Sequence, residues 1–272
     1  MTVDLKKLAE SQQEWAVGVR RELHACPELR WEEGETLRII RAYVDGIVAA
    51  AAVPWVVQVR ELRGGLVVDI TVDPTLERRL FRADVDALPI PEETGLPFAS
   101  TNGNSHACGH DMHAAMLLGF FRAMMEFPEV GPKHNLRLVW QRAEENPITP
   151  SGGNVLVNEE NVCEGIARAF GLHVWSDRQA GTFYSRPGAI LANSDRFQVE
   201  IACKGGHVME PQSGSNAIDV AVDIVCALRG FDRRYLGPME PCSLVPAVFT
   251  AGSASNIRPD TARQWFAARN FL

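Results

Sequence analysis

The sequence predicts an α/β protein whose larger first part is a mostly parallel sheet flanked by helices, followed by a smaller α+β unit. Strand-like and helix-like segments alternate in the first part, which is typical of a parallel sheet. Its strand segments are continuous apolar runs, as expected for strands buried on both faces. Near residues 186–188 the pattern changes to strand, helix, strand and strand, which indicates an antiparallel sheet with its own helix.

Two amphipathic helices are predicted at the N-terminus. Residues 2–25 and 35–50 each carry an apolar stripe at helical spacing, and Pro27 follows where the first helix should end. The stripes consist of Trp15, Val19 and Leu23 in the first helix and of Leu37, Ile40, Val44 and Ile47 in the second.

The other elements follow in chain order. In the first part we expect strands at 53–59, 65–72, 79–85, 135–141 and 167–175, and helices at 112–127 and about 152–160. In the second part we expect strands at 196–203, 243–251 and 262–271 and a helix at 216–228. The change of pattern predicts two domains, residues 1–188 and 189–272.

Charge and composition exclude several classes of protein. The formal net charge is −7, whereas nucleic-acid-binding domains are basic. The most apolar run, 47–57, is too short for a membrane span and contains Pro54. The N-terminus has no apolar segment typical of a secretory signal, and the cysteines form no CxxC pair. We therefore predict a cytoplasmic protein with reduced thiols that binds neither nucleic acid nor membrane.

Side chains suited to metal binding follow several predicted strands. They are Asp84 and Asp86 after the strand at 79–85, Glu144 and Glu145 after 135–141, His173 near the end of 167–175, and Cys108 and His110 just before the helix at 112–127. The carboxyl ends of parallel strands meet at one edge of a sheet, where sites of open α/β proteins are built. We therefore expect these side chains to converge.

Each of these residues has a simpler explanation when taken alone. A single C-x-H motif is a weak metal signal, and a Glu-Glu pair is more often a solvated loop or a first helical turn. A histidine in an apolar strand is more often a core residue, and Asp86 before Ala-Leu-Pro suits a turn. Their shared edge favours a metal site, because thiolate, imidazole and carboxylate suit zinc and related ions. With one glutamate binding metal and its neighbour acting as general base, the set fits an amide hydrolase.

Seven ordered motifs carry a resemblance to a known family. They are RRELHACPELRWEE (20–33), FRADVDALPIPEETGLPFAS (81–100), HACGHDMHAAMLLG (106–119), QRAEEN (141–146), GLHVW (171–175), KGGHVMEP (204–211) and SNIRPD (255–260). Together they resemble the bacterial and plant amidohydrolases of the aminoacylase and carboxypeptidase family, which includes hippurate hydrolases and hydrolases of indole-acetyl amino acids. The motifs cover essentially the whole chain.

The resemblance implies a zinc-peptidase-like α/β domain with an inserted lid domain through which the protein forms a homodimer. It also implies two divalent metal ions (zinc, manganese, cobalt or nickel) and a small N-acyl amino acid as substrate. By matching positions, Cys108, His110, Glu145 and His173 are expected as metal ligands and Glu144 as the general base.

Further roles follow from the same resemblance. Asp84 is expected beside the site to orient a ligand, and His207 in the lid to stabilise the tetrahedral oxyanion in the partner subunit's site. Asn256 is expected to bind the substrate carboxylate. His106 and His113 are expected to support the ligands rather than to bind metal.

The sequence departs from the family pattern in two ways. Arg142 stands where proline is usual and Asn146 where glycine is usual, which predicts a difference in substrate shape more than in metal binding. The chain also ends at Leu272, before the last histidine ligand of the family, which predicts a C-terminally truncated member. The alternatives are therefore a non-catalytic relative that binds metal or ligand, or a dipeptidase or carboxypeptidase of the same family.

Overall fold

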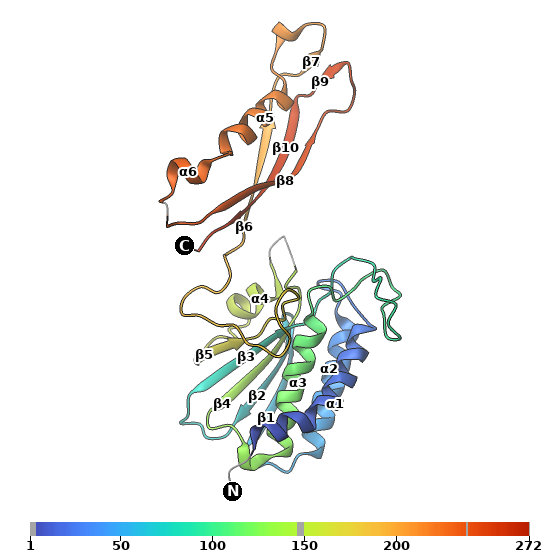
Figure 1. The fold of residues 1–272 in the computed structure, drawn as a ribbon, viewed down its shortest axis with the longest axis vertical. Coiled ribbons are helices and arrows are strands. Elements are labelled where there is room, and N and C mark those ends of the chain that lie inside the picture. Colours follow the sequence, from blue (N-terminus) through green and yellow to red (C-terminus); the bar gives the residue numbers. More distant parts are fainter. Residues whose placement is uncertain (1–3, 146–149, 238, 272) are drawn as a thin grey trace. The chain divides into compact units, whose positions relative to one another are not determined.

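A computed structural model describes residues 4–145, 150–237 and 239–271. The chain divides into two compact units, residues 1–178 and 179–272, which we call the first and second unit. Each unit has its own sheet (Figure 1). The predicted roles of the two parts, a catalytic domain and a lid domain, stay predictions.

The first unit is built on a sheet with the strand order β1-β2-β4-β3-β5 within the described residues. The strands are β1 (Val56–Leu62), β2 (Gly65–Thr71), β3 (Arg78–Asp84), β4 (Asn135–Gln141) and β5 (Ile166–Gly171). β3 pairs in parallel with β4 and β5, whereas β2 is antiparallel to both of its neighbours. Four of these five strands therefore point the same way, which confirms the mostly parallel α/β prediction.

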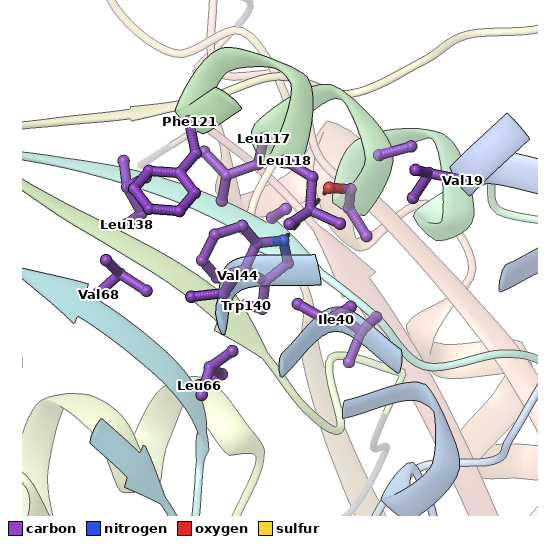
Figure 2. Packing of buried hydrophobic residues seen from close by; sticks show 14 of the residues in the cluster. Val19, Ile40, Val44, Leu66, Val68, Leu117, Leu118, Phe121, Leu138 and Trp140 are labelled. Atoms are coloured by element: carbon purple, nitrogen blue, oxygen red, sulfur yellow. Dashed lines mark hydrogen bonds between the residues drawn. The ribbon is translucent and has the colours of Figure 1, made fainter. Parts of the chain in front are cut away.

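Three helices cover one face of this sheet: α1 (Leu5–His24), α2 (Gly34–Ala50) and α3 (His110–Glu126) (Figure 1). Apolar side chains of β2 and β4 pack against them, with Trp140 fully buried at the centre (Figure 2). The indole Nε1 of Trp140 donates a hydrogen bond to the carbonyl of Ala114 at 3.2 Å. This bond satisfies the polar atom of a buried ring and fixes α3 against β4.

The opposite face is less apolar. Val67, Leu80 and Val139 pack there against Leu156 and Val162. The predicted helix near 152–160 consists of a short α4 (Gly152–Asn154) and a π-helical turn η2 (Val155–Glu159).

An ionic cluster occupies another part of this face. Asp69 is 5% exposed and forms ion pairs with Arg60, Arg78 and Arg137 at 2.9, 3.0 and 2.7 Å. A buried carboxylate needs such partners, because an unpaired buried charge is costly. The expected apolar cover on both faces is thus complete on the helix side only.

The second unit has the predicted α+β character. Within the described residues, β6 (Asp195–Ala202), β10 (Thr261–Arg269) and β8 (Ser243–Ala251) form an antiparallel sheet in that order, and α5 (Ala217–Leu228) packs on it. A short ribbon pairs β7 (Gly206–His207) with β9 (Ile257–Arg258). The remaining short elements are η1 (Pro128–Val130), η3 (Pro211–Ser213) and α6 (Phe231–Tyr235).

None of the helices among the described residues has the length and apolar character needed to cross a membrane.

Candidate metal centre

The expected ligands of the first unit converge where β3 and β4 end, beside the first turn of α3. Cys108, His110 and His173 offer ligand atoms that lie within 4.8 Å of one another. His110, Glu144 and Glu145 form a second such group. Because both groups contain His110, the five side chains make one continuous cluster.

His110 has one ring nitrogen held and the other open. Its Nδ1 lies 3.1 Å from Oδ1 of Asp86, and its buried Nε2 has no hydrogen-bond partner among the described residues. Burial alone favours the neutral ring, but the hydrogen bond with Asp86, the proximity of Cys108 and the charge of Asp84 raise the pKa of His110 to about 11. The surroundings therefore favour a cation at Nε2, either a proton or a metal ion.

Cys108 and His173 meet from segments far apart in the sequence. Sγ of Cys108 lies 3.5 Å from Nε2 of His173, and Nδ1 of His173 donates to the carbonyl oxygen of Val174 at 2.6 Å. That hydrogen bond leaves the lone pair on Nε2, facing the sulfur. His173 lies in the loop after β5 rather than in the strand, because β5 ends at Gly171.

The two adjacent glutamates follow β4 in a tight turn at Ala143, which is buried and has a φ of 48°. The backbone N–H of Glu145 donates to Oδ2 of Asp86 at 2.8 Å. Burial first, and then the charge of Glu145, raises the pKa of Glu144. A carboxylate with a raised pKa takes up and releases protons nearer to neutral pH, as a general base must. Asn146 lies outside the described residues.

His113 and Asp84 lie beside this cluster and form hydrogen bonds that hold the segments around it in place. Nδ1 of His113 donates to Oδ1 of Asp84 at 2.6 Å, and its Nε2 accepts the backbone N–H of Val174 at 3.0 Å. His113 therefore has no free lone pair for a metal ion. Burial opposes ionisation of Asp84, but the hydrogen bond from His113 and the charge of Arg82 hold the pKa of Asp84 well below its usual range.

His106 belongs to none of the ligand groups found among the described residues. It is 6% exposed, and neither ring nitrogen has a hydrogen-bond partner in the described part of the chain. Burial lowers the pKa of His106 to about 4, so its ring is neutral near pH 7. Its place beside the ligand-bearing loop fits a packing role.

The motif at 20–33 reaches the start of α3 through His24. Nδ1 of His24 lies 2.7 Å from Oδ2 of Asp111, the neighbour of His110, and Nε2 lies 3.0 Å from Oε1 of Glu92. Nε of Arg20 approaches the same Asp111 oxygen at 2.6 Å. These contacts join α1, the loop after β3 and the end of α3 that carries His110.

The two candidate residues of the second unit lie close together in the chain's fold: His207 is in β7, and Asn256 is in the turn just before β9. His207 pairs with Ile257 in the β7–β9 ribbon, and the backbone N–H of Val208 donates to the carbonyl of Asn256 at 3.1 Å. Both candidate side chains are exposed. Nδ1 of His207 accepts the N–H of Met209 at 3.2 Å, so its Nε2 carries the proton and can donate it in a hydrogen bond.

The residues of the first unit fit a divalent metal ion. A thiol, two imidazoles and carboxylates form a donor set suited to zinc and other late first-row ions. The unpartnered Nε2 of His110 is a buried polar atom whose surroundings supply negative charge. An ion bound there would give this atom the partner that it lacks among the described residues.

Asp86 has a supporting position in the cluster that the sequence did not reveal. One of its oxygens faces Nδ1 of His110 and the other accepts the N–H of Glu145, so it links two ligand-bearing segments. The Asp-x-Asp spacing at the end of β3 was visible in the sequence. It did not show which of the two aspartates would contact His110.

Comparisons with known proteins identify the family to which the chain belongs. The model of peptidase family M20/M25/M40 matches residues 80–257. The chain is 37% identical over 250 residues to the N-acetyl-L-cysteine deacetylase of Bacillus subtilis (strain 168), covering 90% of this chain and 56% of that protein. The chain thus spans little more than half the length of this relative.

Solved structures give the same result. A putative aminohydrolase from methicillin-resistant Staphylococcus aureus superposes with a TM-score of 0.84 at 31% identity, covering 98% of this chain and 66% of that one. A Bacillus subtilis protein described as a dinuclear metal-binding peptidase from the M20 family gives a TM-score of 0.74 at 29% identity, covering 97% and 65%. The family match spans more than half of the chain and includes all five residues of the ligand cluster, and on these grounds the chain belongs to peptidase family M20/M25/M40.

Proposed function

We propose that this chain belongs to a metal-dependent amidohydrolase that cleaves the amide bond of N-acyl amino acids. The observation that carries the proposal is the cluster of Cys108, His110, Glu145 and His173 next to Glu144. These four residues would hold two divalent ions together with donors from outside the cluster. The relative described as an N-acetyl-L-cysteine deacetylase supports an N-acyl amino acid as substrate.

The residues divide the chemical work. Bound divalent ions would lower the pKa of water and polarise the amide carbonyl. Glu144 would take the proton of the attacking water and pass it to the leaving nitrogen, a role that suits a carboxylate of raised pKa. Asp84 would keep His113 and the ligands around it in place.

The second unit would act as a lid. Nε2–H of His207 would donate a hydrogen bond to the developing oxyanion, in the partner subunit's site of a homodimer, and Asn256 would bind the substrate carboxylate. Zinc, manganese, cobalt or nickel would suit the donors, and a cytoplasmic location completes the proposal.

The test is a substrate panel on the purified chain with added zinc, manganese or cobalt. We expect release of the amino acid from N-acetyl or N-benzoyl amino acids in preference to dipeptides. Cys108→Ser should lower the metal content sharply, whereas the exposed-thiol control Cys163→Ser should not. Tight metal binding without turnover of any substrate would favour the non-catalytic alternative, and an unchanged metal content in Cys108→Ser would refute the ligand assignment.

A further inference from the structure

We infer that Glu33 is a positioning residue for the Glu144–Glu145 pair, acting through the turn at Arg142 and Ala143. The inference rests on the proposed function, because the pair matters only if it serves a metal-dependent reaction. It gives the motif at 20–33 a role beyond packing.

Glu33 lies at the N-cap of α2 but does not cap it. Its side chain makes no hydrogen bond to the first turn of the helix. Glu28 caps this turn instead: its two carboxylate oxygens accept the N–H groups of Glu35 and Thr36 at 3.2 and 2.7 Å. Glu33 is 0% exposed, and burial raises its pKa. Burying a carboxylate without a partner is costly, so Glu33 is expected to have hydrogen-bond partners outside helix α2.

Those partners lie in the turn after β4. Oε1 of Glu33 accepts the backbone N–H of Ala143 at 2.7 Å, and Oε2 accepts Nε–H of Arg142 at 2.8 Å. Another guanidinium nitrogen of Arg142 donates to the carbonyl of Trp31 at 2.8 Å. The carboxylate of Glu33 thus holds the side chain of one turn residue and the backbone of the next.

The turn needs such a clamp. Ala143 has a φ of 48°, a left-handed conformation that is unfavourable for a residue with a Cβ. This conformation turns the chain at the end of β4, so that Oε2 of Glu144 lies 4.0 Å from Nε2 of His110. On the far side of the turn, Asp86 accepts the N–H of Glu145 at 2.8 Å. Two buried carboxylates, Glu33 and Asp86, therefore fix the pair from opposite ends.

A purely structural role for the Glu33–Arg142 ion pair predicts a loss of stability only. A positioning role predicts weaker metal binding in protein that is still folded. Co²⁺ is a suitable probe, because its visible absorption reports the donors around it, and binding can be measured without substrate.

The experiment titrates the full chain and its variants with Co²⁺ and records the absorption spectrum and the thermal midpoint. We expect Glu33→Ala to weaken Co²⁺ binding at least tenfold and to change the ligand-field bands. Glu33→Gln keeps an oxygen that can accept the N–H of Ala143, so it should recover most of the affinity. The matched control Glu28→Ala removes a helix cap and should lower the midpoint while leaving Co²⁺ affinity within twofold.

Two further variants separate positioning from folding. Ala143→Gly added to Glu33→Ala should restore part of the affinity, because glycine adopts the left-handed turn without a clamp. Glu33→Leu with Arg142→Leu replaces the ion pair by apolar groups, which often preserves folding, and should bind Co²⁺ as weakly as Glu33→Ala. Binding within twofold of wild type in Glu33→Ala, or in this double variant if Glu33→Ala does not fold, overturns the inference alone. Absence of Co²⁺ binding by the wild-type chain overturns the proposed function as well.

Discussion

The two units present their candidate functional residues in opposite ways. In the first unit His110 is buried, and Asp86 and His113 hold the segments that carry the ligands. In the second unit His207 is exposed on a short two-stranded ribbon, and Asn256 is exposed in the turn next to it. The difference teaches that the fold of the first unit itself positions its candidate ligands, whereas the second unit presents its candidate side chains to solvent.

The largest effect is expected for substitution of Glu144, which should lower turnover without lowering the metal content. Glu144→Gln keeps the size of the side chain but removes the base, so turnover should fall about 10²- to 10⁴-fold while metal content is retained. The adjacent Glu145→Gln should instead lower metal content. Turnover and metal analysis on both variants test this pair, and equal metal loss in the two would contradict the division of roles.

Substitution of His207 tests the proposed role of the second unit. His207→Ala should lower kcat about 10²- to 10³-fold, as is typical when one oxyanion donor is removed, without changing metal affinity. The exposed Met209→Ala, two residues further on, is a control for general disturbance of the ribbon. A drop in metal affinity in His207→Ala would show that the two units do not divide the work as proposed.

Substitution of Asp86 tests how strongly the fold of the first unit positions the candidate ligands. Asp86→Asn weakens the hold on Nδ1 of His110, and the loss of such a partner typically costs about 10- to 100-fold in metal affinity. Asp73→Asn, at an exposed turn of the same unit, should have no effect on the affinity. Isothermal titration with zinc gives both values.

The smallest effect expected, about tenfold for each pH unit, is a pH dependence of metal binding. Because the pKa of His110 is raised to about 11, the metal-free ring is protonated at pH 7 and must lose its proton to bind an ion. Affinity should therefore rise with pH, by about tenfold per pH unit between pH 7 and 9 if one proton is released. Zinc titrations in two buffers of different protonation enthalpy count that proton. A flat profile would mean that His110 is already neutral.

Much of the first unit could be predicted because its signals are local. Continuous apolar runs gave the strands, and the placement of Cys108 and His110 before a helix correctly anticipated a cluster at the strand ends. The end of β5 was predicted four residues too late, because the apolar run GLHVW continues past the last hydrogen-bonded residue, Gly171.

The contacts of the buried charges could not be predicted in the same way. Glu33 and Arg142 are 109 residues apart, and His113 contacts Val174 across 61 residues. Such pairings depend on which segments the fold brings together, and no spacing rule within a motif encodes them. The π-helical turn at 155–159 was likewise read as part of an ordinary helix, since the apolar spacing is similar over so few residues.

The hydrogen bond from the N–H of Val174 to Nε2 of His113 affects how fast the protein can acquire an ion. It orders the residue next to His173 while no ion is bound. The loop therefore loses its conformational entropy when the chain folds, and not when the ion binds. A preorganised site of this kind binds with little conformational delay. In the metal-free protein, the amide of Val174 should exchange its hydrogen slowly, although it lies in a loop with an exposed histidine beside it.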